Sequence, residues 1–159
     1  MEGARGTLTG TMGVDVLTTS AASVVHEADM IFTGLEGDSP IPAGPGHVGT
    51  GGCSVPIDWQ VFAVSPLMHR LGTQQNMFRR RLGKFAATLH DGAFDSTMQL
   101  IYPTNEAFAV NDQIQVECTW NNTTGNPVDL GEDFNMEECL TAIYKWPAGL
   151  PPKSCVSSL

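Results

Sequence analysis

The chain has 159 residues, a length typical of one domain that can bury its own hydrophobic core. Hydrophobic residues make up 42% and charged residues 16%, with 17 glycines and 10 prolines, which is typical of a folded, turn-rich protein and not of a disordered one. The formal net charge is −9, so no nucleic acid is expected as a partner, because binding to phosphates depends on cations.

Short runs with period-two alternation recur along the chain, and they predict an antiparallel all-β domain with little helix. The expected strands are residues 13–18, 23–32, 59–64, 76–82, 84–89, 97–101, 113–120 and 140–146. Alternation in the run 113–120 directs Ile114, Val116 and Trp120 toward the core. The same alternation directs Gln115 and Glu117 toward the solvent.

Turn residues separate these runs. The Gly- and Pro-rich segment 34–52 is predicted to be a long loop, the His-Asp-Gly sequence at 90–92 a hairpin turn, and residues 121–127 a polar loop. About eight short strands with such turns predict a β-sandwich or jelly roll. We expect a single domain, in which residues 1–50 supply N-terminal strands and the Gly/Pro-rich loop.

The four cysteines indicate disulfide bonds. Cys53, Cys118, Cys139 and Cys155 form no Cys-x-x-Cys pair, so two disulfides are expected instead of a zinc ribbon, and three connectivities are open. Disulfides persist in oxidising compartments, which predicts a secreted, periplasmic or cell-surface location. The sequence offers neither a secretory signal nor an apolar run long enough to span a membrane. We therefore expect a fragment, or a chain whose leader has been removed.

Three segments carry an ordered set of motifs. Residues 52–73 place a cysteine before a strand that ends in Leu-Met-His and is followed by Leu-Gly; residues 112–122 end in Cys-x-aromatic-Asn; residues 131–140 run from a glycine to Glu-Glu-Cys. Together they resemble the C-terminal catalytic domain of the copper type II, ascorbate-dependent monooxygenases, the family of dopamine β-hydroxylase and peptidylglycine α-hydroxylating monooxygenase. The resemblance implies that residues 51–159 form a β-sandwich of that kind.

The resemblance also implies a disulfide pattern and a copper site. It pairs Cys118 with Cys139 and Cys53 with Cys155. The family's copper in this domain is held by two histidines of a His-x-His pair and by one methionine, and a thioether suits Cu(I).

At the matching positions of this chain, Leu67 replaces the first histidine, His69 retains the second, and Glu138 replaces the methionine. A carboxylate is a hard donor and a poor ligand for Cu(I). Met136 is a possible substitute ligand, because in an extended segment it would share a face with Glu138. No copper is expected at full occupancy, although copper is the cofactor if the site functions.

Other motifs carry less chemistry. The acids between 129 and 138 match no calcium loop and are interpreted as a solvated face. Asn121 and Asn122 each begin an Asn-x-Thr sequon, which has meaning only in a glycosylating host. The basic run between 70 and 84 is interpreted as a solvated strand face.

Three functional hypotheses follow from the resemblance. The first is a non-catalytic structural or binding module that has kept the scaffold and lost most copper ligands, with no catalytic residue. The second is a fragment of an active monooxygenase that uses O2 and ascorbate and needs a preceding copper domain or another protein chain as partner. The third is a copper-binding protein without redox activity. The ligand replacements favour the first, and this chain alone is expected to be inactive.

Overall fold

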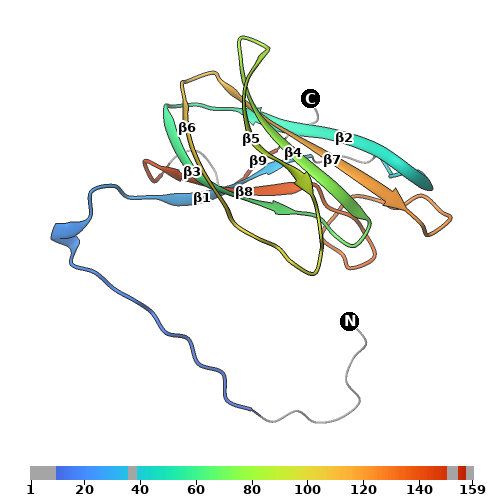
Figure 1. Cartoon of the computed structure of the whole chain (residues 1–159), viewed down its shortest axis with the longest axis horizontal. Helices are drawn as coiled ribbons and strands as arrows, with labels where there is room; N and C mark the ends of the chain where they lie inside the picture. Colours follow the sequence, from blue (N-terminus) through green and yellow to red (C-terminus); the bar gives the residue numbers. More distant parts are fainter. Residues whose placement is uncertain (1–9, 36–38, 150–153, 157–159) are drawn as a thin grey trace.

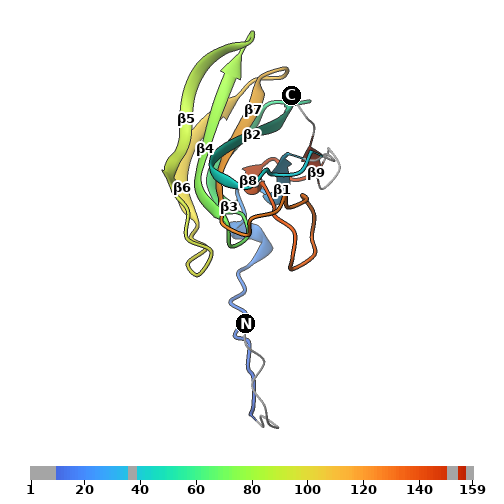
Figure 2. The same ribbon diagram turned by 90° about the vertical axis from the view of Figure 1, so that its right-hand side faces the viewer.

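The computed structural model describes residues 10–35 and 39–149, and the backbone alone of residues 154–156. These residues form two packed β-sheets, so the predicted all-β sandwich is confirmed (Figures 1 and 2). The strands are β1 (Asp29–Gly34), β2 (Gly44–Ser54), β3 (Trp59–Leu67), β4 (Gly72–Arg81), β5 (Lys84–Ala93), β6 (Tyr102–Phe108), β7 (Gln113–Asn122), β8 (Leu140–Trp146) and β9 (Ser154–Val156).

One sheet has the strand order β6-β3-β8-β1-β9 and the other the order β2-β7-β4-β5. The paired strands are antiparallel except for β1 and β9, which are parallel. The only helical element in the described part of the chain is the 3₁₀ turn η1 (Ala21–Ser23). No helix there is long and apolar enough to cross a membrane.

The core lies between the sheets and follows the predicted alternation of β7. Ile114, Val116 and Trp120 are fully buried, as expected. Gln115 differs from the prediction, because it lies on the outer face and is nevertheless buried. Its side chain is held between Arg80 and Glu117, which cover it from the neighbouring strand and from its own.

Strand β2 corrects the expectation of a long loop at 34–52. The C-terminal half of β2 is rich in glycine because the backbones of β1 and β7 lie very close to it. A Cβ on Gly51 would overlap the carbonyl of Gly34, and a Cβ on Gly52 would overlap the carbonyl of Ile114. Glycine here permits close packing, so a composition typical of loops builds an eleven-residue strand.

Two expected strands are absent. Residues 13–18 are exposed and belong to no strand. Figure 1 shows that the chain between residue 10 and β1 extends away from the sandwich. Residues 97–101 form a turn and an irregular stretch before β6. Alternation in sequence is insufficient where no neighbouring strand supplies hydrogen-bond partners.

The hairpin between β4 and β5 also differs from the prediction. Residues 90–92 lie inside β5, and the chain reverses instead at Leu82 and Gly83. Both residues have positive φ angles, 51° and 74°. That pair of conformations is typical of the tight turns that match strand twist, and glycine supplies the second without steric cost.

A buried ion pair ties the start of β1 to the end of β8. The Lys145 side chain is completely buried, and its Nζ lies 2.6 Å from an Asp29 carboxylate oxygen. Nζ also donates to the carbonyl of Pro147 at 2.9 Å and lies 5.2 Å from the centre of the Trp59 ring. These partners compensate for burying the ammonium group, which would otherwise be strongly unfavourable.

The disulfide expected between Cys118 and Cys139 is present, with Cα atoms 5.9 Å apart. It joins β7 of one sheet to the residue that precedes β8 of the other. Cys53 is also disulfide-bonded. The side chain of its expected partner, Cys155, lies outside the described residues, although the backbone of Cys155 pairs with Thr33 in β1.

Replacing both Cys118 and Cys139 with alanine is expected to lower the free energy of unfolding by about 3 kcal/mol, because the disulfide closes a loop with a sequence separation of 21. Denaturant titration of the variant and the unmodified protein measures the difference. A loss below about 1 kcal/mol would contradict a stabilising role of this bond between the sheets.

Candidate functional site

The candidate site lies where the turn between β3 and β4 meets the segment that leads into β8. Met68 of that turn is buried in the core, so the next residue, His69, is directed outward. His69 borders a surface hollow of about 730 Å³. The hollow is lined by Met68, His69, Arg70, Ser96, Thr97, Gln99, Glu132 and Phe134.

The imidazole of His69 is held at both nitrogens. Nδ1 lies 2.8 Å from the carbonyl oxygen of Met136, and because a carbonyl can only accept, Nδ1 carries a proton. Nε2 lies 3.5 Å from a carboxylate oxygen of Glu138. The ring is therefore oriented by backbone and presents Nε2 to Glu138, an arrangement also typical of histidines that bind metal ions.

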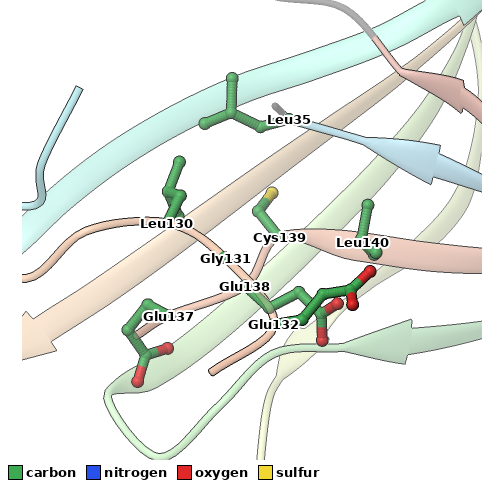
Figure 3. Close-up of a pocket in the computed structure, with 8 residues that line it drawn as sticks. All are labelled: Leu35, Leu130, Gly131, Glu132, Glu137, Glu138, Cys139 and Leu140. Atoms are coloured by element: carbon green, nitrogen blue, oxygen red, sulfur yellow. The ribbon is translucent and has the colours of Figure 1, made fainter. Parts of the chain in front are cut away.

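Glu138 stands in an environment that disfavours its charge. Burial raises the pKa of its carboxyl group, and the nearby Glu132 carboxylate raises the pKa further, while His69 opposes the shift. Figure 3 shows the Glu138 and Glu132 carboxylates close together, in a small pocket of about 120 Å³. A partly buried carboxyl group next to a second acid therefore holds its proton to a higher pH than an exposed one, which is the meaning of the raised pKa of Glu138.

Glu137 points the other way, as Figure 3 shows, and only 1% of its surface is exposed. Its Oε1 accepts a hydrogen bond of 2.8 Å from the backbone N–H of Leu71. Its Oε2 and the indole N–H of Trp120 are both buried and lack a hydrogen bond of normal geometry. Burial raises the pKa of Glu137, and the Leu71 amide, His69 and Trp120 oppose that shift.

The structure brings together His69 and Glu138, and Leu67 lies at the end of β3, paired with Leu140. The segment before Glu138 lacks the extended path that would place Met136 and Glu138 on one face. It turns at residues 131–136, and the Met136 amide donates to the Asp133 carbonyl. The sulfur of Met136 packs against Gly131, whereas its carbonyl oxygen contacts His69.

The copper that the resemblance implies requires two imidazoles and a thioether. The donors that converge at this place are one imidazole nitrogen and one carboxylate. Within residues 10–35 and 39–149, no three His, Cys, Asp or Glu side chains gather closely enough to hold a metal ion. The residues present therefore do not fit a copper ion held in the family's manner.

The other histidines lie elsewhere. His26 stacks on Trp146 with ring centres 4.0 Å apart, and His47 lies 6.1 Å from the Trp120 ring. His90 is buried beside Tyr102, and burial lowers its pKa. None of the three is near enough to complete a ligand set with His69.

Glu137 is the residue that sequence reasoning missed, because the acids between 129 and 138 were interpreted as one solvated face. Two adjacent acids directly before a strand cannot both face solvent if side chains alternate there. That alternation was the available signal for one buried carboxyl group.

Comparisons with protein-family models and with curated proteins found no match to this chain.

The free energy of unfolding of Glu137→Gln, relative to that of the unmodified protein, is expected to increase as the pH rises from about 4 to about 8. A raised pKa in the folded state means that the folded protein binds the proton more tightly than the unfolded chain does. The stability from this carboxyl group is therefore present at low pH and lost as the pH rises through the folded pKa, whereas glutamine cannot titrate.

Denaturant titrations of both proteins across that pH range measure the difference. Glu27→Gln, at an exposed position, is the control and should show no comparable trend. A difference between Glu137→Gln and the unmodified protein that does not change with pH would contradict the buried, ionisable role of Glu137.

Proposed function

We propose that this chain is a non-catalytic module related to the C-terminal domain of the copper type II, ascorbate-dependent monooxygenases. Its role is structural or binding, and the partner is a preceding domain or another protein chain. The observation that carries the proposal is the 3.5 Å approach of His69 to Glu138. The resemblance assigned these two residues to one site although 69 positions separate them.

The fold and the disulfide add support. The sandwich has the architecture that the resemblance implies, and the Cys118–Cys139 bond lies directly beside Glu138. The motifs at 52–73, 112–122 and 131–140 also lie close together in space, as the resemblance would require.

The loss of catalysis is argued from the donors. Leu67 offers no ligand atom, and Glu138 offers oxygen in place of sulfur. Hard oxygen donors disfavour Cu(I), which a monooxygenase cycle of this family must reach. The sulfur of Met136 packs against Gly131, so the segment would have to rearrange before that thioether could reach His69.

A specific observation also supports the copper-binding alternative. The Met136 carbonyl fixes the His69 ring in the orientation of a ligand, with Nε2 available. A metal-binding protein without redox activity would use the same orientation. Direct measurement of Cu(I) affinity separates the two proposals.

We expect the unmodified protein to bind no stoichiometric Cu(I) and Leu67→His combined with Glu138→Met to raise the affinity by more than about tenfold, because the change restores one imidazole and one thioether. Competition titration against a Cu(I) chelator measures the affinity.

The matched control is the same double variant with His69→Ala added, which should lose the gain. If the unmodified protein binds one Cu(I) tightly and His69→Ala alone abolishes that binding, the non-catalytic proposal fails. Met136 is then the first candidate for the replacement ligand.

A further inference from the structure

The end of β7 carries two overlapping sequons for N-linked glycosylation. Asn121-Asn122-Thr123 is the first, and Asn122-Thr123-Thr124 is the second. Both have the Asn-x-Thr pattern, so the sequence alone gives no reason to prefer either. The structure distinguishes them, because the two asparagines lie on opposite sides of the strand.

Asn122 faces inward and is fully engaged. Only 2% of its surface is exposed, and its Nδ2 donates to the carbonyls of Ile41 at 3.0 Å and Asn126 at 2.8 Å. Its Oδ1 accepts from both the backbone N–H and the hydroxyl of Thr124, at 3.1 and 2.8 Å. The residues of the second sequon thus hydrogen-bond to one another in the turn that follows β7. A sugar on the Asn122 amide nitrogen would break a buried hydrogen bond and would not fit beside a side chain that is almost completely buried.

Asn121 faces outward and is exposed, as is Thr123, the hydroxyl residue of the first sequon. The Asn121 backbone is fixed, since its N–H donates to the Leu71 carbonyl at 2.8 Å. The side chains of Asn121 and Thr123 make no hydrogen bond to any residue that the structure describes. The side chains of the first sequon therefore take no part in the hydrogen bonds of the turn that follows β7, although the two sequons overlap.

The surroundings suit a hydrated sugar. Asn121 lies at the end of the outer face of the four-stranded sheet, opposite the exposed Pro45 of β2, and polar side chains cover the face on the β4 side. Gln74 and Asp91 are hydrogen-bonded to each other across that face, and the Thr73 hydroxyl donates to the Thr119 carbonyl. A disulfide such as Cys118–Cys139 is typical of proteins in oxidising compartments, and oligosaccharide transfer in eukaryotic cells takes place in one of these.

We propose that Asn121 is an N-glycosylation site and that Asn122 is not. The glycosyl donor is a lipid-linked oligosaccharide. The Asn121 amide nitrogen forms a bond to the anomeric carbon, the bond from that carbon to the lipid pyrophosphate breaks, and the amide loses one proton. The site is independent of the proposed function, because it needs neither a metal nor the His69 region.

The experiment directs the full chain into the secretory pathway of a glycosylating eukaryotic cell and analyses the secreted, folded protein. Intact mass before and after treatment with peptide-N-glycosidase counts the glycans, and peptide mapping locates them. We expect one glycan, at Asn121, which is lost in Asn121→Gln.

Two threonine variants give the matched comparison. Thr123→Ala destroys the first sequon and leaves the second intact, so the glycan should disappear while the melting temperature stays unchanged. Thr124→Ala destroys only the second sequon, so the glycan should remain. Secreted protein without any glycan, or with a glycan on Asn122 in either the unmodified chain or Thr123→Ala, overturns the proposal.

Discussion

The link between the two sheets at the Cys118–Cys139 disulfide is the constraint on which the rest of the site depends. The disulfide is accompanied by Gln75, a fully buried amide of β4. Its Nε2 donates to the Leu140 carbonyl at 3.0 Å, and its Oε1 accepts from the Thr141 hydroxyl at 2.7 Å. One covalent bond and two buried hydrogen bonds thus fix β8 against the opposite sheet, which matters because a buried polar group without partners is costly.

The fixed start of β8 determines what the two preceding acids do. With Cys139 held in the core, Glu138 is directed toward His69 and Glu137 toward Trp120 and the Leu71 amide. Desolvation outweighs the favourable partners at both positions, since both pKa values are raised. The same short segment therefore holds one carboxyl group as an internal anchor for the β3–β4 turn and exposes the other beside an imidazole.

The sequence predicts those parts of the fold that depend on local alternation and on cysteine position. Val116 and Trp120 are buried as the alternation of β7 predicts, and the disulfide between Cys118 and Cys139 was expected from the resemblance to the monooxygenases. The glycine-rich β2 could not be predicted, because its glycines are explained by the approach of β1 and β7, which are distant in sequence. The prediction of a strand at 13–18 was wrong for the converse reason: the residues alternate, but no strand in the described part of the chain pairs with them.

The approach of His69 to Glu138 was expected from the resemblance, whereas the course of the segment before Glu138 was not predicted. Met136 would share a face with Glu138 only in an extended segment, and the chain turns at residues 131–136. Alternation alone assigns a side chain to a face only while the chain stays extended. A glycine, two acids and an asparagine in that segment are typical turn residues, and they were the local signal against an extended path.

The stability of the scaffold does not depend on the atoms that would bind a metal. Large buried side chains such as Trp59, Phe108 and Ile143 form the core, whereas His69 and Glu138 have side-chain exposures of 27% and 22%. Leu67 pairs with Leu140, so an apolar cross-strand pair occupies the end of β3 next to His69. A fold held by a disulfide, a buried amide and an apolar core does not depend on these two side chains for its shape. That separation is the physical reason why substitutions of His69 and Glu138 should leave the sandwich intact.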